Sequence, residues 1–383
     1  MDRAPSFRIG APSLKGINVH VGYSAIFQNP GDQLSDTEVY QNEVRLAELA
    51  EPLGFESIWG VEHHFTDYTM CPDVIQFLTY MAGRTRKAQL GSMVIVLPWH
   101  DPIRVAEQIS MLDHVSGGRM ILGIGRGVGR VEYEGFRLDM NTSRERFEEY
   151  TKMVLDGLEQ GYLECDGDFV KQPKRDIRPR PLKSFRGRTY GAAVSNETMP
   201  LMVKNHAGIL VVPQKPWSVV KNDILLYNAA YRKEHGEDAP KPLVGGWTFV
   251  DESADRAEEL GRKYIKEYYE SVIKHYEFDD VHLSKTKGYE FYGKGFQEKI
   301  QELGKDKVID FLVDLACFGT PEQCFERIMH FHNLTDMNGY MAILSYSGMP
   351  YAEAERNMRL FASSVLPELK KVEVAEAEFA LSA

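Results

Sequence analysis

Residues 88–124, AQLGSMVIVLPWHDPIRVAEQISMLDHVSGGRMILGI, contain a strand, a helix and a second strand in succession. The run 88–96 is apolar and stops before Pro98, and 120–124 is a second short apolar run. Between them, residues 102–115 have an amphipathic pattern, and Gly117-Gly118 is typical of a helix end. The stretch predicts two buried strands joined by a helix, which is the repeating unit of an α/β fold.

The same alternation extends over most of the chain. Strand-like runs are expected at 17–23, 55–61, 88–96, 120–124, 189–194, 208–212, 242–250 and 339–345. Helical runs follow them at 37–53, 73–84, 102–115, 143–160, 197–205, 218–235, 253–269 and 350–366. Eight alternations without a break in composition favour one closed (β/α)₈ barrel, a TIM barrel of the α/β class with long loops at its C-terminal face, over an open doubly wound sheet.

Two segments interrupt this pattern. Residues 162–186 are rich in Pro, Arg and Lys, and predict an irregular loop with short β possibilities that covers one end of the fold. Residues 270–307 are polar and aromatic with little periodicity, and we expect a mobile loop there.

The glycine-rich run 123–129, GIGRGVG, raises the alternative of a dinucleotide-binding Rossmann fold. The spacing does not fit, because the third glycine of G-x-G-x-x-G would fall on Val128 or Arg130. No helix is expected to begin there. The barrel is therefore the preferred interpretation.

Composition and net charge limit the kinds of molecule that this protein is expected to bind. The 383 residues have a net charge of −11 and 43% hydrophobic residues, which argues against broad attraction to nucleic acid or to a membrane surface. No membrane span or signal peptide is predicted, and four cysteines do not suggest a disulfide framework. We expect a cytoplasmic enzyme with a small-molecule substrate.

Residues at the C-terminal ends of the predicted strands are the candidates for chemistry, because active sites of such barrels lie there. The second strand ends in Glu62-His63-His64-Phe65. Adjacent histidines on extended chain point to opposite sides, so no metal site is predicted. One imidazole facing the barrel mouth as an acid, base or hydrogen-bond donor is favoured, with two packing histidines as the alternative.

Two arginines are candidates for anion binding. Arg126 follows the fourth strand and Arg144 begins the next long helix, so both are expected near the barrel mouth. A guanidinium group suits phosphate, although ordinary salt bridges would also explain both residues. Ser195 and Thr198, at the start of the helix at 197–205, offer N–H and hydroxyl groups to an anion or serve as a simple cap.

The motifs together resemble the bacterial luciferase-like, flavin-dependent monooxygenases, and in particular chains similar to the luciferase catalytic subunit. The resemblance spans residues 16–369, leaving 1–15 as an N-terminal extension and 370–383 as a tail. Its densest matches lie at 61–66, 95–98, 101–113, 116–119, 123–127, 139–144 and 319–322.

The resemblance implies a monooxygenase that takes reduced FMN from a separate flavin reductase. Oxygen would form a flavin peroxide that oxidises a hydrophobic aldehyde, ketone or related molecule. His63 would be the catalytic imidazole, and Arg126, Arg144, Ser195 and Thr198 would hold the FMN phosphate. Three further positions are implied at the flavin ring, namely Met93 and Val94, whose peptide would be cis, and Val194.

The family likeness also implies a homodimer and a lid within 270–307 that includes Lys287-Gly288-Tyr289. Two positions depart from the catalytic subunit: Gly125 replaces a reactive cysteine, leaving more room beside the flavin, and Val194 replaces a glutamate. These changes put light emission in doubt and predict a different substrate. Two alternatives are a deazaflavin-dependent oxidoreductase of the same fold and a noncatalytic partner subunit.

Overall fold

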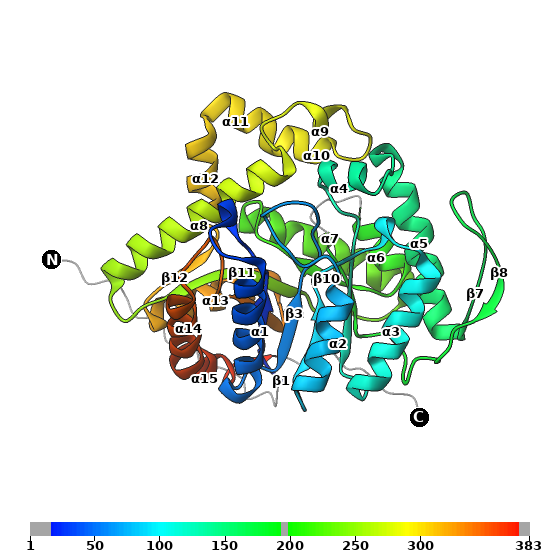
Figure 1. Cartoon of the computed structure of the whole chain (residues 1–383), viewed down its shortest axis with the longest axis horizontal. Coiled ribbons are helices and arrows are strands. Elements are labelled where there is room, and N and C mark those ends of the chain that lie inside the picture. The colour runs from blue at the N-terminus through cyan, green and yellow to red at the C-terminus, as the bar shows by residue number, and fades with distance from the viewer. Residues whose placement is uncertain (1–16, 193–197, 375–383) are drawn as a thin grey trace.

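The computed structural model describes residues 17–192 and 198–374. Within them, eight parallel strands close into a barrel in the order β2, β3, β4, β6, β9, β10, β11 and β13, with β13 paired to β2. Figure 1 shows the helices arranged around this barrel. The TIM-barrel prediction is confirmed.

The barrel strands lie close to the expected positions. Their bounds are β2 His20–Ala25, β3 Ser57–Gly60, β4 Gln89–Ser92, β6 Met120–Gly125, β9 Thr189–Ala192, β10 Gly208–Val211, β11 Leu243–Val250 and β13 Gly339–Ile343. Four short strands accompany them among the described residues: β5 Ile95–Val96 on β6, β12 Cys317–Gly319 on β11, and β1 Ile17–Asn18 paired with β14 Glu373–Val374.

Most of the outer helices also follow the predicted periodicity, and α13 is an addition to it. They are α1 Asp36–Leu53, α2 Val74–Arg84, α3 Pro102–Ser116, α5 Ser143–Gln160, α6 Met199–Lys204, α7 Trp217–His235, α8 Ala254–Tyr276, α13 Pro321–Thr335, α14 Tyr351–Leu360 and α15 Leu366–Leu369. Local signals set their ends, as in the reciprocal capping box of Ser35 and Glu38 at the start of α1 and left-handed Gly54 at its end. No helix of the described residues is both long and apolar enough to cross a membrane.

Three parts of the chain differ from expectation. A short helix, α4 Arg130–Gly135, does begin after the glycine run, although its glycine spacing is still not that of a Rossmann motif. Residues 162–176 form an antiparallel hairpin of β7 Tyr162–Asp166 and β8 Lys171–Asp176, which projects from the barrel (Figure 1). Strand β12 and helix α13, the latter capped by Thr320 and Gln323, were not predicted as elements.

The segment expected as a loop at 270–307 is largely helical. Helix α8 continues to Tyr276, and the short helices α9 His282–Lys285, α10 Glu290–Tyr292, η4 Gly293–Gln297, α11 Glu298–Leu303 and α12 Lys305–Val313 follow. Figure 1 shows them gathered at the top of the molecule. Phe278 stacks on Phe296 at 4.6 Å and on Tyr292 at 5.8 Å, so the aromatic residues of this segment pack on each other. We call residues 277–304 the lid segment.

The interior of the barrel is filled by side chains rather than open. The cluster comprises Trp59, Ile121, Tyr190, Leu210, Leu243 and Met341. Trp59 fits because the facing strand carries Gly91, where a Cβ would lie 2.3 Å from the indole ring. Met93 and Val94 pack against this cluster, so the candidate site lies directly above closely packed side chains.

A buried carboxyl group joins the first helix to the last barrel strand. Glu43 of α1 is 2% exposed and accepts a hydrogen bond of 2.7 Å from the Ser345 hydroxyl, just beyond β13. Burial raises the pKa of Glu43 to about 7, and the hydrogen bonds only partly offset this effect.

The raised pKa predicts a loss of stability as pH rises. Below about pH 4.5 the carboxyl is protonated in both states, whereas between pH 4.5 and about 7 only the unfolded chain ionises. Stability should therefore fall by roughly 3 kcal/mol across this interval. The melting temperature of the parent protein should therefore fall between pH 5 and pH 7.5. Glu43→Gln should remove most of this fall, whereas Glu48→Gln, at a partly exposed site on the same helix, should keep it. An unchanged slope in Glu43→Gln would contradict the assignment.

Candidate active site

A cavity of about 190 Å³ lies at the C-terminal mouth of the barrel, between strand ends and the lid segment. Its apolar walls include Ile26, Val61, Met93, Val94, Val212, Trp247 and Ile343. Trp99 also lines it and adds a flat aromatic surface. From α8 and the lid segment, Tyr276, Phe278 and Tyr292 close the opposite side.

The paired histidines have different surroundings. His63 lines the cavity and its side chain is 17% exposed. His64 is buried, points to the Glu62 carboxylate at 3.1 Å, and packs against Trp99 and Phe136. The structure therefore brings one imidazole to the barrel mouth and buries the other; a catalytic role for His63 remains a prediction.

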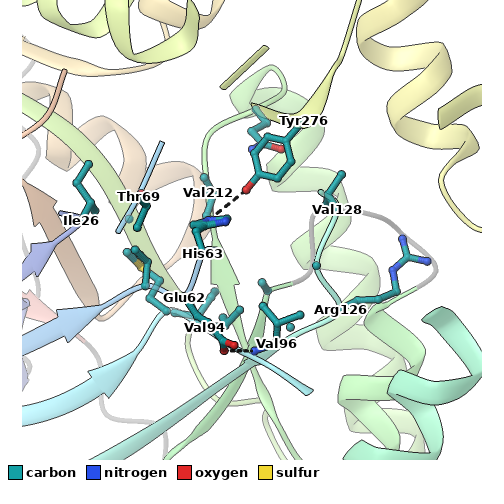
Figure 2. A pocket seen from close by; sticks show the side chains of 18 of the residues that line it. Ile26, Glu62, His63, Thr69, Val94, Val96, Arg126, Val128, Val212 and Tyr276 are labelled. Atoms are coloured by element: carbon teal, nitrogen blue, oxygen red, sulfur yellow. Dashed lines mark hydrogen bonds between the residues drawn. The ribbon is translucent and has the colours of Figure 1, made fainter. Parts of the chain in front are cut away.

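Glu62 anchors the wall of the cavity. Its carboxylate accepts hydrogen bonds from His100, His64 and the backbone N–H of Val96, the last at 2.8 Å (Figure 2). Burial alone would raise the pKa of Glu62, but these hydrogen bonds outweigh it and hold the pKa below its ordinary value. The carboxylate thus ties the end of β3 to the segment at β5.

The peptide between Met93 and Val94 is cis, as the family resemblance implied. The side chains of both residues line the cavity. A Cβ on Gly125 would lie 2.4 Å from Cγ2 of Val94. The expectation of extra room at Gly125 was therefore wrong, because the Val94 side chain fills that space.

The two arginines approach each other at the lid segment. A Cβ on Gly288 would lie 2.8 Å from Nη1 of Arg126 and 3.2 Å from Nε of Arg144, and Gly288 has a φ of +82°. Arg144 donates a hydrogen bond of 3.3 Å to the Gly288 carbonyl. The Arg126 guanidinium lies over the Tyr289 ring at 4.0 Å. A glycine is required at 288 both by its backbone conformation and by this close approach.

Arg126 and Thr198 line the same cavity as His63. Figure 2 shows Arg126 at one end of the pocket, Ile26 and Thr69 at the other, and His63 between them. Nη1 of Arg126 is buried without a hydrogen-bond partner among the described residues. Val194 and Ser195, the other two expected cofactor contacts, lie outside the described residues.

A hydrogen-bonded cluster that the sequence did not predict surrounds His63. Its Nδ1 lies 2.9 Å from Oε1 of Glu132, in α4, and its Nε2 lies 3.3 Å from the Tyr276 hydroxyl. Burial raises the pKa of Tyr276 well above its ordinary value, so the hydroxyl stays protonated and can donate to Nε2. His275 contacts both groups, because its Nε2 lies 3.5 Å from Oε2 of Glu132 and its ring centroid lies 5.2 Å from that of His63.

His63, Glu132 and His275 offer three metal-ligand atoms within 4.8 Å of one another. The hydrogen bond of 2.9 Å between His63 and Glu132 already accounts for two of these groups. No metal is needed to explain their arrangement. Nothing in the sequence pointed to Glu132 or His275, since both are remote from His63 along the chain.

Comparison with known proteins supplies the family context. A family model described as luciferase-like monooxygenase matches residues 19–337. The alkanal monooxygenase alpha chain of Photorhabdus luminescens is 29% identical over 348 residues, which cover 88% of this chain and 94% of that protein.

Solved structures share the fold at lower identity. The monooxygenase RslO1 from Streptomyces bottropensis superposes with a TM-score of 0.76 at 23% identity, covering 91% of this chain and 99% of that one. The oxygenating constituent of 3,6-diketocamphane monooxygenase from Pseudomonas putida, in complex with FMN, has a TM-score of 0.70 at 17% identity, with 92% and 99% covered. An F420-dependent secondary alcohol dehydrogenase has a TM-score of 0.67 at 16% identity, with 91% and 99% covered.

Proposed function

The chain belongs to the luciferase-like monooxygenase family, and on that premise we propose that it uses reduced FMN and oxygen to oxidise a small hydrophobic aldehyde, ketone or related molecule. One observation carries the choice of cofactor. Arg126 lines the cavity that holds His63, and its Nη1 is buried without a hydrogen-bond partner among the described residues. A phosphate oxygen is the acceptor that suits such a group.

Reduced FMN, when bound, supplies the two electrons that let one atom of oxygen enter the substrate while the other leaves as water. Arg126 and Arg144 would hold the phosphate with Thr198, and Ser195 and Val194 are proposed contacts by family likeness. Met93 and Val94 would form an apolar seat for the ring system. Arg126 lies at one end of the pocket and Ile26 at the other (Figure 2), an arrangement that suits a cofactor with an anionic tail and a flat head.

The remaining groups of the cavity suit proton transfer in a dry site. Nε2 of His63 faces the cavity, where an imidazole can accept and return a proton near neutral pH. Tyr276, Phe278 and Tyr292 cover the mouth and exclude water, which protects reactive oxygen chemistry from hydrolysis and leakage. The apolar walls favour a hydrophobic substrate.

By family likeness, we also propose a separate flavin reductase as electron donor, a homodimer and a cytoplasmic location. The fold shared with the F420-dependent alcohol dehydrogenase keeps a deazaflavin cofactor as the second candidate. A noncatalytic partner subunit is disfavoured by the presence of His63, Arg126 and Arg144 around one region of the barrel mouth.

Anaerobic titration separates the two cofactors. We expect reduced FMN to bind more tightly than the reduced deazaflavin, and tighter binding of the latter would overturn the cofactor assignment. Turnover with a generic flavin reductase, ¹⁸O₂ and a panel of aldehydes and cyclic ketones should then give a product with one labelled oxygen by mass spectrometry. Unlabelled products from every substrate that reacts would contradict a monooxygenase.

Arg126→Ala should weaken FMN binding by about 1 to 3 kcal/mol, or roughly 5- to 150-fold in Kd, because it removes a charge-assisted phosphate contact. Isothermal titration or fluorescence measures this change. Arg232→Ala, at an exposed arginine near the end of α7, is the matched control and should bind FMN as the parent does. Unchanged affinity in Arg126→Ala would remove this residue from the site.

A further inference from the structure

A buried carboxylate stands behind the imidazole that faces the cavity. Glu132 is fully buried at the third position of α4. Its Oε1 accepts from Nδ1 of His63 at 2.9 Å and from the backbone N–H of His64 at 3.0 Å. The side chain therefore joins the loop after β3 to the segment after β6, on the side of His63 away from the cavity.

The charge on Glu132 decides which atom of His63 carries the proton. Burial alone would raise the pKa of Glu132, but its interactions with the His63 and His275 imidazoles outweigh burial and lower it to about 2. The group is thus a carboxylate at neutral pH and can only accept hydrogen bonds. The hydrogen atom in its contact with His63 must then belong to Nδ1.

We propose that Glu132 is a positioning residue that fixes the Nδ1–H tautomer of His63 and leaves the lone pair of Nε2 directed at the cavity. This inference rests on the proposed function in giving His63 the role of proton acceptor. The Tyr276 hydroxyl lies 3.3 Å from Nε2, where it can donate to the lone pair that this tautomer leaves on that atom. A carboxylate that orients a catalytic imidazole in this way is a recurrent device in enzymes.

His275 lies beside the other carboxylate oxygen of Glu132, with its Nε2 3.5 Å from Oε2 and no hydrogen bond between the two atoms. Its Nδ1 lies 2.9 Å from the Thr66 hydroxyl, and its ring stacks on Tyr68 at 4.5 Å. Burial lowers the pKa of His275, although Glu132 partly opposes that effect, so the ring is neutral at neutral pH. With Thr66 donating to Nδ1, Nε2–H of His275 faces Oε2 of Glu132.

A glycine makes this arrangement possible. A Cβ on Gly129 would lie 2.3 Å from Oε2 of Glu132 and 3.3 Å from Nε2 of His275. Any larger residue would push the carboxylate away from the two imidazoles. His275 is also the penultimate residue of α8, immediately before the lid segment, so the cluster ties His63 to the base of the lid.

The tautomer itself is the first readout of the test, and it needs no flavin and no substrate. In full-length protein with ¹⁵N-labelled histidine, ring nitrogens that carry a proton have chemical shifts distinct from those that do not. The signals of His63 are assigned by their absence from His63→Gln. We expect a protonated Nδ1 in the parent protein and a shift of the proton to Nε2 in Glu132→Leu, which removes the acceptor.

Turnover provides the second readout. Glu132→Leu should lower kcat by about 10- to 100-fold, because the imidazole no longer presents a lone pair to the cavity, while the Kd for FMN and the KM for substrate stay within about twofold. Glu134→Gln, which neutralises an exposed carboxylate on the same helix, is the control and should match the parent in every measurement.

The charge is tested separately with Glu132→Gln, which keeps the size of the side chain. The groups that face His63 are Glu132 from α4, His275 and Tyr276 from α8, and Tyr68 from the loop after β3. Glu132 is the anion among them, so its loss should move the acidic limb of the kcat profile to lower pH. Glu132→Asp, which keeps the charge, should restore the parental limb.

These outcomes separate the two hypotheses. Nδ1 protonation and parental kcat in a folded Glu132→Leu would overturn the positioning role. If Glu132→Leu does not fold, the positioning role would instead be overturned by a Glu132→Gln protein whose plot of kcat against pH has the same acidic limb as the parent. A protein that shows the expected tautomer change but binds no reduced flavin would retain the role of Glu132 and reject the proposed monooxygenase.

Discussion

His63→Gln is expected to lower turnover by about 10²- to 10⁴-fold while the Kd for FMN stays within about twofold. The imidazole lines the cavity through Nε2 and is held from behind by Glu132, so glutamine loses proton transfer but keeps much of the volume. The proposed phosphate site at Arg126 lies elsewhere on the cavity wall, so cofactor binding should survive (Figure 2).

Steady-state turnover with saturating reduced FMN and oxygen checks this expectation, together with the release of hydrogen peroxide as a measure of wasted cofactor oxidation. His330→Gln, at an exposed histidine on α13, is the matched control and should leave both rates unchanged. If His63→Gln turns over at the parental rate with normal coupling, this imidazole is not the proton acceptor of the reaction.

The second large effect concerns folding. Gly123→Ala should abolish the stable barrel, because a Cβ on Gly123 of β6 would lie 1.8 Å from the Ser92 carbonyl oxygen. The obstacle is backbone, which cannot rotate away as a side chain does. Ser92 also exchanges two hydrogen bonds of 2.8 Å with Gly123. Overpacking of cores costs about 1–3 kcal/mol in general, and we expect more here because two strands would separate.

Soluble yield and melting temperature measure the effect of Gly123→Ala. The control is Gly83→Ala in α2, where a Cβ would meet no atom within 4 Å and where alanine favours the helix by about 1 kcal/mol. That variant should be as stable as the parent or more so. A soluble Gly123→Ala protein with parental melting temperature would contradict the packing of β4 against β6.

The barrel was predictable because its pattern is local and repeated. Residues 37–53 and 143–160 show one-sided apolar periodicity that matches α1 and α5 within one residue. Every strand of the barrel is a short apolar run between turn signals. The family assignment followed from the order of the motifs, and the match over residues 19–337 confirms it.

The lid segment was not predictable by the same means. Its aromatic residues, such as Phe278 and Phe296, stack on each other instead of presenting one face to the barrel, so no helical period emerges. For this reason the sequence-based prediction ended the helix at residue 269 and missed the seven residues, 270–276, that complete α8. A pattern that depends on packing within a small cluster leaves little trace in the sequence.

The candidate site was predictable in its parts but not in its connections. His63 and Arg126 follow barrel strands, and that position alone brings them to one cavity. Glu132 is 69 residues from His63 along the chain, and only the closed barrel brings the two within 2.9 Å. A sequence shows which groups are present at strand ends, whereas the partners that orient them come from tertiary structure.

The filled interior of the barrel has a kinetic consequence. Side chains of Trp59, Tyr190 and Met341, with the rest of their cluster, block passage through the barrel, so a ligand reaches the cavity from the side of the lid segment. On the proposed function, reduced FMN and the substrate would both enter from that side. We then expect the molecule that binds deeper to bind first and to leave last.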